Sequence, residues 1–195
     1  TTNLWLSKGA GETWEKLEGV GGYYGIGFGT DGALLIGATV GKKSNLPEGA
    51  EKGGIYRSTD DGATWELALE AELDQKVKPQ TFDGHVYWPT KQGLAVSADG
   101  GKSWKMMAGS PKASAWGPFF GQTESEMVVV NAEGIHKTAD GGETWQVLVP
   151  KNQLPKPIAD ANFGGLMPNF AWDPQNNVLY CTSMGVGLFK KELGE

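Results

Sequence analysis

The chain has 195 residues, among them 30 glycines and 8 tryptophans, and this length suits one domain with a sizeable core. Its glycine content of about 15% is roughly twice the usual share, which indicates short strands and tight turns. The net charge of −6 with dispersed basic residues argues against a nucleic-acid partner, no apolar run is long enough to span a membrane, and the lone Cys181 excludes an internal disulfide or a cysteine-bound zinc ion.

Short strands joined by turns account for most of the sequence. The chain opens with two predicted strands, NLWLS and WEKL, and continues with three sets of four. Within those sets, the first strands lie in GYYGIGFG, KPQTFDG and WGPFFGQ, the second in ALLIGAT, HVYWPT and EMVVVN, the third in GGIYRS, GLAVS and GIHKT, and the fourth in WELAL, WKMM and WQVLV. A last set of three follows in NFAWDP, NVLYCTS and GLFKK. Helical periodicity is weak throughout, although EAELDQK could form one turn.

One eight-residue motif separates the third and fourth strand of each set. Complete copies read STDDGATW (58–65), SADGGKSW (97–104) and TADGGETW (138–145). A degenerate copy, SKGAGETW (7–14), has Gly9 where the others have aspartate. The closing tryptophans are 51, 39 and 41 residues apart, which is the spacing of β-propeller blades.

The residue types of the motif suit a β-hairpin turn. An aspartate accepts hydrogen bonds from nearby backbone N–H groups, glycine supplies positive φ, and a serine or threonine hydroxyl adds a local bond. The tryptophan buries a large ring beside the next repeat. The predicted structural residues are therefore Ser58, Asp60, Gly62, Trp65, Ser97, Asp99, Gly101, Trp104, Thr138, Asp140, Gly142 and Trp145.

These elements predict an all-β fold of four-stranded antiparallel propeller blades, as one domain or partial propeller over residues 1–195. Seventeen strands do not make a tidy closed ring. We expect the C-terminal part of a ring of six to eight blades, with another chain or segment completing it. A self-contained five-bladed ring is the alternative.

The motif resembles the Asp-box, or BNR, repeat of sialidases, two-propeller xyloglucanases, sortilin-like receptors and a photosystem II assembly factor. The resemblance covers nearly the whole chain and implies an extracellular or periplasmic protein. In these families the Asp-box is a structural turn away from the active site. Sialidase activity is not expected, because those enzymes hold a carboxylate with three arginines and this chain has only Arg57.

Loop lengths predict on which face a ligand would bind. The turns on the Asp-box face are all short, whereas the opposite face carries the longest insertions, at 40–52 and 150–168. Carboxylates for a two-carboxylate glycosidase would come from this opposite face, and solvated loop charges are the other interpretation of them. They are Glu48, Glu51, Glu70, Glu72, Asp74 and Asp160.

Aromatic residues near the predicted central channel are the candidate ligand-binding residues, because sugar rings stack on such side chains. Packing between blades explains them equally well. The candidates are Tyr23, Tyr24, Trp88, Trp116 and Trp172. The two histidines, His85 and His136, lack a nearby cluster of Asp or Glu residues and indicate neither a metal site nor a triad.

The sequence therefore predicts a binding or scaffold module for a glycan or protein partner, without a cofactor or a metal. The alternative is a glycan-active enzyme, a glycoside hydrolase or polysaccharide lyase, with its site on the face opposite the Asp-boxes. The sequence identifies no catalytic residue and leaves the presence of an activity open.

Overall fold

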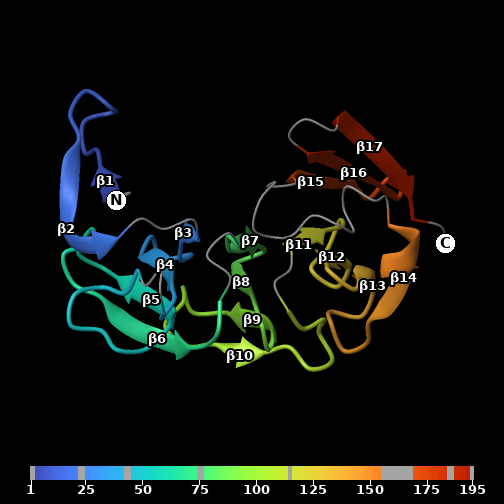
Figure 1. Cartoon of the computed structure of the whole chain (residues 1–195), viewed down its shortest axis with the longest axis horizontal. Coiled ribbons are helices and arrows are strands. Elements are labelled where there is room, and N and C mark those ends of the chain that lie inside the picture. Colours follow the sequence, from blue (N-terminus) through green and yellow to red (C-terminus); the bar gives the residue numbers. More distant parts are fainter. Residues whose placement is uncertain are drawn as a thin grey trace. The chain divides into compact units, whose positions relative to one another are not determined.

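A computed structural model describes residues 3–21, 25–41, 45–73, 77–113, 116–154, 169–183 and 187–193. The chain forms two compact units, Thr1–Met106 and Met107–Glu195, and Figure 1 labels their elements. Each unit is described by itself below. Within the described residues, no helix has the length and apolar character needed to cross a membrane.

The first unit contains three antiparallel sheets whose strands pair with their neighbours in chain order (Figure 1). A two-stranded sheet consists of β1 (Asn3–Leu6) and β2 (Glu15–Gly21). A four-stranded sheet consists of β3 (Ile26–Phe28), β4 (Leu34–Ala38), β5 (Gly54–Ser58) and β6 (Glu66–Glu70). A second one consists of β7 (Gln80–Phe82), β8 (His85–Thr90), β9 (Gly93–Ser97) and β10 (Lys105–Met106).

The second unit contains two antiparallel sheets of the same kind. The four-stranded one consists of β11 (Trp116–Phe120), β12 (Met127–Asn131), β13 (Gly134–Thr138) and β14 (Gln146–Pro150). A single turn of 3₁₀ helix, η1 (Lys151–Gln153), follows it. The three-stranded sheet consists of β15 (Asn169–Asp173), β16 (Val178–Ser183) and β17 (Gly187–Glu192).

These sheets confirm the predicted all-β fold of four-stranded antiparallel blades, and each predicted strand appears where the sequence placed it. Two local details differ. The sequence did not predict η1, and the described part of the proposed helical turn EAELDQK, residues 70–73, is not helical. Glu70 is the last residue of β6 there, because β6 continues to pair with β5.

The third strand of each four-stranded sheet begins with a glycine for a steric reason. Gly54, Gly93 and Gly134 have φ angles of 155°, 141° and 148°. A Cβ atom on Gly54 would collide with the carbonyl oxygen of Leu69, and one on Gly134 with that of Val149. The fourth strand therefore approaches the third so closely that only glycine fits there.

Alternating residues of the β3–β6 sheet bury its two faces against its two neighbours, as expected from the period of two in a strand. One face packs Ile36 and Tyr56 against Leu4 and Leu17 of the β1–β2 sheet. The other face forms a cluster with the β7–β10 sheet, namely Leu35, Ile55, Leu73, Val86 and Trp88. Each such side chain contributes roughly 1.5–3 kcal/mol when fully buried, so contact between sheets stabilises the first unit.

The second unit is held together in the same way. Val128, Val130 and Ile135 pack against Leu179 and Cys181 of the three-stranded sheet. Burial raises the pKa of the Cys181 thiol to about 11, which agrees with its predicted place in an apolar strand.

The three complete motif copies, 58–65, 97–104 and 138–145, form the turns between third and fourth strands, and we call them the motif hairpins. In the first, the Ser58 hydroxyl accepts the Gly62 N–H at 2.8 Å and donates to Asp60 Oδ1 at 2.7 Å. Asp60 accepts the backbone N–H and the hydroxyl of Thr64 at 2.9 and 2.6 Å. One serine and one aspartate thereby pair four donors that a tight turn leaves exposed.

The same bonds recur in the other two motif hairpins. The Gly101 and Gly142 amides donate to Ser97 and Thr138 at 2.8 and 3.0 Å. Asp99 accepts Ser103, and Asp140 accepts Thr144, each through both amide and hydroxyl. The indole N–H groups of Trp104 and Trp145 donate to the carbonyls of Gly101 and Gly142 at 3.1 and 3.2 Å. Trp65 differs, since its buried Nε1 has no partner among the described residues.

The degenerate copy at 7–14 keeps half of this network. The Gly11 N–H donates to Ser7 Oγ at 2.9 Å, and Trp14 Nε1 donates to the Gly11 carbonyl at 3.1 Å. Gly9 has no carboxylate to accept the second pair of donors. This hairpin therefore forms with the serine and tryptophan hydrogen bonds and without the aspartate bonds.

A cation immediately before the motif links neighbouring sheets. Arg57, whose side chain is 11% exposed, pairs through Nη2 with Asp31 in the β3–β4 turn. Its Nε donates to the carbonyl of Gly100, in the next motif hairpin, at 3.2 Å. Lys137 precedes the third motif hairpin in the same way, and its Nζ lies 5.3 Å from the centre of the Trp172 ring on the neighbouring sheet. Such a cation over an indole is attractive.

The motif carboxylates should make stability sensitive to acid. The Thr64 hydroxyl and amide and the Ser58 hydroxyl lower the pKa of Asp60 to about 2, and the equivalent bonds lower the pKa of Asp140 to about 2. An unfolded aspartate has a pKa of about 3.9. Unfolding therefore takes up protons between these values, so stability is full above about pH 4 and falls as the pH drops toward 2.

We expect the Asp140→Asn variant to lose less stability than the unsubstituted protein across this window. Urea unfolding followed by circular dichroism from pH 5 to pH 2 measures it. Asp83→Asn, in the β7–β8 turn outside the motif hairpins, is the matched control and should keep the original slope. An unchanged slope in Asp140→Asn would contradict the proposed role of the hairpin bonds.

Removing the Arg57 link should weaken the first unit. Arg57→Met leaves the Gly100 carbonyl and Asp31 without their partner, which lowers the free energy of unfolding by about 1–3 kcal/mol. Lys102 also lies near Asp31, at 3.6 Å, but its side chain is 61% exposed. Lys102→Met should therefore change stability by less than about 0.5 kcal/mol. Equal urea midpoints for Arg57→Met and the unsubstituted protein would rule out the link.

Candidate functional site

The three aromatic candidates that the structure describes, Trp88, Trp116 and Trp172, pack in the clusters between sheets. Trp88 is completely buried, and its ring meets the Trp104 ring edge-on, with 6.4 Å between the ring centres. Trp88 belongs to the buried cluster between the β3–β6 and β7–β10 sheets, and such burial favours packing over the predicted ligand stacking. The Trp116 ring packs against the Phe170 ring, with 5.6 Å between the ring centres, and the Lys137 ammonium lies over the Trp172 ring.

For the half-buried Trp116 and Trp172, ligand stacking stays a prediction, while Tyr23 and Tyr24 lie outside the described residues. The exposed aromatic side chains in the described part are different ones: Trp5, Trp14 and Phe28 are 51%, 61% and 63% exposed. The sequence does not predict that these three rings are exposed, since exposure depends on which neighbouring sheet covers a given strand face.

A groove lies at the end of the first unit opposite the motif hairpins, at the junction of the β3–β6 and β7–β10 sheets. Its volume is about 690 Å³, within the range of roughly 300–1,000 Å³ typical of ligand sites. It is formed by the ends of β4 and β6, the segment after β6, and the β8–β9 turn. The lining residues are Ala38, Thr39, Val40, Gly53, Glu70, Ala71, Glu72, Leu73, Lys91 and Gln92.

Backbone hydrogen bonds fix the walls of this groove. The Lys91 N–H donates to the Glu72 carbonyl at 2.9 Å, and the Glu72 N–H donates to Gln92 Oε1 at 3.2 Å. On the other side, the Ala71 N–H donates to the Gly53 carbonyl at 3.3 Å. The floor is Leu73, which belongs to the buried cluster with Trp88. The groove is therefore bounded by hydrogen-bonded backbone and lies beside the buried cluster of the first unit.

The insertion 40–52 borders the groove and is anchored by one buried amide. Asn45 Oδ1 accepts the Thr39 N–H at 2.7 Å, and Asn45 Nδ2 donates to the Gly37 carbonyl at 3.3 Å. At the far end of the insertion, the Tyr56 hydroxyl donates to the Lys52 carbonyl at 2.6 Å. The other predicted insertion, 150–168, is described only to residue 154.

Two of the predicted carboxylates, Glu70 and Glu72, meet in this groove. Glu70 pairs with Lys52 at 2.6 Å and Glu72 with Lys91 at 3.1 Å, and all four side chains are more than half exposed. The Glu70 hydrogen bond and charge raise the pKa of Lys52 above its ordinary value. Each carboxylate thus lies against one ammonium group, and the groove offers both hydrogen-bond acceptors and donors.

Of the other predicted carboxylates, the structure describes only Glu48 and Glu51. Glu48 and Glu51 line a separate hollow with Tyr56 and Trp65, and Asp74 and Asp160 lie outside the described residues. Across the described part of the chain, no group of three His, Cys, Asp or Glu side chains is placed to hold a metal ion.

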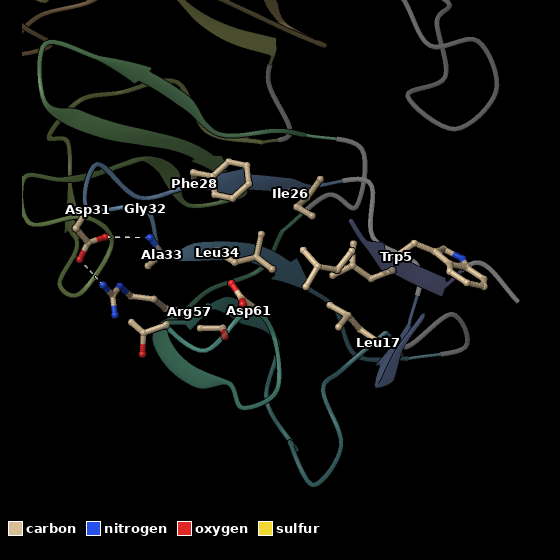
Figure 2. Close-up of a pocket in the computed structure, with 14 residues that line it drawn as sticks. Trp5, Leu17, Ile26, Phe28, Asp31, Gly32, Ala33, Leu34, Arg57 and Asp61 are labelled. Atoms are coloured by element: carbon tan, nitrogen blue, oxygen red, sulfur yellow. Dashed lines mark hydrogen bonds and ion pairs between the residues drawn. The ribbon is translucent and has the colours of Figure 1, made fainter. Parts of the chain in front are cut away.

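A second cavity, of about 260 Å³, lies at the junction of the β1–β2 and β3–β6 sheets, at the end that carries the motif hairpins. Figure 2 shows the Asp31–Arg57 pair at one end of it and Leu34 in its wall. Leu4, Leu6, Leu17, Ile26 and Phe28 also line it. This cavity is not on the face where the sequence predicts a ligand site, which is the face opposite the motif hairpins.

Comparison with known proteins places this arrangement among known folds. No protein-family model matches the chain, and no curated protein matches its sequence. Among solved structures, an ancestral GH74 enzyme matches the whole chain with a TM-score of 0.53 and 15% identity. The chain is built of β-propeller blades.

Two further solved propellers give weaker matches. A GH74 xyloglucanase from Xanthomonas campestris is 18% identical over 83% of this chain, with a TM-score of 0.48. YCF48 from Cyanidioschyzon merolae is 16% identical over 92%, with a TM-score of 0.46. The chain spans 25% and 27% of the two GH74 enzymes and 58% of YCF48. At these identities the likeness shows the fold alone.

The packing role of Trp88 can be measured. Trp88→Ala should lower the free energy of unfolding by about 3–5 kcal/mol, because it empties a fully buried site. Trp14→Ala removes a ring that is 61% exposed and should cost much less. Urea unfolding of both variants tests this, and similar losses for the two would contradict the assignment of Trp88 to the core.

Proposed function

We propose that this chain is a non-catalytic binding module that holds an uncharged, hydroxyl-rich ligand, a segment of a glycan, in the groove between the β3–β6 and β7–β10 sheets. The observation that carries the proposal is the pairing of Glu70 with Lys52 and of Glu72 with Lys91. Glu70, Glu72 and Lys91 line the open groove, and Lys52 lies against Glu70 beside it. The paired charges sum to zero, which favours an uncharged ligand over an ionic one.

The small residues of the groove support this proposal. Ala38, Gly53 and Ala71 leave room for a chain to approach the backbone, while Thr39 and Gln92 add a hydroxyl and an amide. Hydroxyl, amide and carboxylate groups together offer both donors and acceptors, as recognition of sugar hydroxyls requires. A protein partner is the other candidate ligand for the same face.

Membership of the Asp-box repeat family and an extracellular or periplasmic location are part of the same proposal. Three complete motif copies in hairpin turns support the family. We further propose that another segment or chain completes the propeller. In support, the β1–β2 sheet has two described strands and the β15–β17 sheet three, whereas the other sheets have four.

A glycan-active enzyme is the second candidate, because Glu70 and Glu72 line the same groove. A glycosidase needs one carboxyl group that is protonated and can donate to the leaving oxygen. Both glutamates are exposed, and each accepts a lysine ammonium, at 2.6 Å for Glu70 and 3.1 Å for Glu72, so both carboxylates already act as acceptors in ion pairs. The geometry therefore favours binding over hydrolysis.

Binding and hydrolysis can be separated with one pair of variants. We expect the protein to bind a neutral oligosaccharide on a glycan array and to release no product from it. Glu72→Gln should weaken binding about tenfold, which corresponds to about 1.4 kcal/mol. Glu66→Gln, on β6 outside the groove, is the matched control and should bind normally. Release of shorter oligosaccharides that stops in Glu72→Gln would establish the enzyme instead.

A further inference from the structure

The cavity in Figure 2 exists where one copy of the repeat lacks a side chain that another copy has. Arg57 stands immediately before Ser58, and Leu6 stands immediately before Ser7, the serine of the degenerate copy. Arg57 reaches from its own sheet to Gly100 in the next motif hairpin. Leu6 is shorter and has no donor, so the equivalent space beside the hairpin 58–65 is left open.

The position equivalent to Gly100 in that hairpin is Asp61, which lies at the rim of the cavity (Figure 2). This cavity therefore has an acidic residue at the hairpin position that Arg57 contacts, through Gly100, in the neighbouring pair of sheets. Asp61 is paired with Lys8 at 2.7 Å, but their side chains are 62% and 66% exposed. Exposed pairs of this kind are weak, so another cation can replace Lys8.

The walls of the cavity suit the stem of a long cationic side chain. Leu4, Leu6, Leu17, Ile26 and Leu34 present aliphatic surface, against which the methylene groups of an arginine or lysine pack well. At about 260 Å³, the cavity is smaller than the roughly 300–1,000 Å³ of a drug-sized ligand site. It fits one side chain of a partner better than an entire ligand.

The other charges around the cavity are compensated within the protein. Arg57 lines the far end, where its guanidinium is paired with Asp31. Lys102 also lies 3.6 Å from Asp31, so Asp31 has two cations of its own. Asp61, by contrast, is paired with a single exposed lysine, Lys8. In addition, the net charge of −6 attracts basic partners at long range.

We propose that this cavity is a docking site for an arginine side chain of a partner protein. Its stem lies against the leucines, and its guanidinium replaces Lys8 on Asp61, in the way that Arg57 bridges the next pair of sheets. A guanidinium suits the site better than an ammonium because its fork can bind a carboxylate and a carbonyl together. This proposal does not depend on the glycan groove, which lies at the other end of the sheets.

The first test is a titration with blocked tripeptides, followed by NMR shifts of the methyl groups of Leu6, Ile26 and Leu34. Gly-Arg-Gly should shift these methyls, while Gly-citrulline-Gly, which has no charge, should bind at least tenfold more weakly. Asp61→Asn should weaken Gly-Arg-Gly by a similar factor, and Lys8→Met should strengthen it because a competitor is gone. Equal binding of Gly-norleucine-Gly would show an apolar occupant and overturn the proposal, as would an absence of shifts.

The second test places the arginine in the chain itself. Leu6→Arg should rebuild the link seen at Arg57, raise the thermal midpoint by a few degrees and abolish Gly-Arg-Gly binding. Leu188→Arg, at an exposed position on β17 of the second unit, adds the same charge and should change neither property. A Leu6→Arg protein that is folded and still binds the peptide would contradict the proposal, and Asp61→Asn keeps the first test decisive if Leu6→Arg fails to fold.

Discussion

The hydrogen-bond network of a serine or threonine hydroxyl, an aspartate carboxylate and a glycine amide is the interaction on which the blades depend. In each complete motif hairpin it pairs the turn donors locally, as Asp60 does with Thr64. The turn then joins the third and fourth strands as an antiparallel pair and directs the closing tryptophan toward the neighbouring sheet. It also places the residue before it, Arg57 or Lys137, where it reaches the next sheet.

Departures from the repeat border the groove and the smaller cavity of the first unit. The insertion 40–52, anchored by Asn45, borders the groove that carries Glu70 and Glu72. Leu6, where another copy has Arg57, borders the smaller cavity. Where the copies agree, glycines and large side chains bring the sheets together, as with Gly101 on Leu35. The two proposed ligand sites therefore lie where the repeats differ, not at the motif that defines them.

The sequence predicted the strands because motif spacing and hairpin chemistry are local properties. It could not assign roles to aromatic residues in the same way, since Trp88 is covered by contacts between sheets that no local pattern reveals. Glu70 and Glu72 were two of six candidate carboxylates, and only the fold shows that they share a groove. In the sequence, Leu6 is an ordinary strand residue. Its link to the smaller cavity becomes visible only when it is compared with Arg57, whose Nε contacts the next motif hairpin.

Native-state amide hydrogen exchange measures the hairpin network most directly. The amides of Thr64, Ser103 and Thr144 donate to the motif aspartates, whereas Gly9 offers no carboxylate in the degenerate hairpin. The account predicts slower exchange at these three amides than at Thr13, their counterpart, with similar protection of Gly11 and Gly62, which both donate to a serine. Exchange at Thr64, Ser103 and Thr144 as fast as at Thr13 would contradict it.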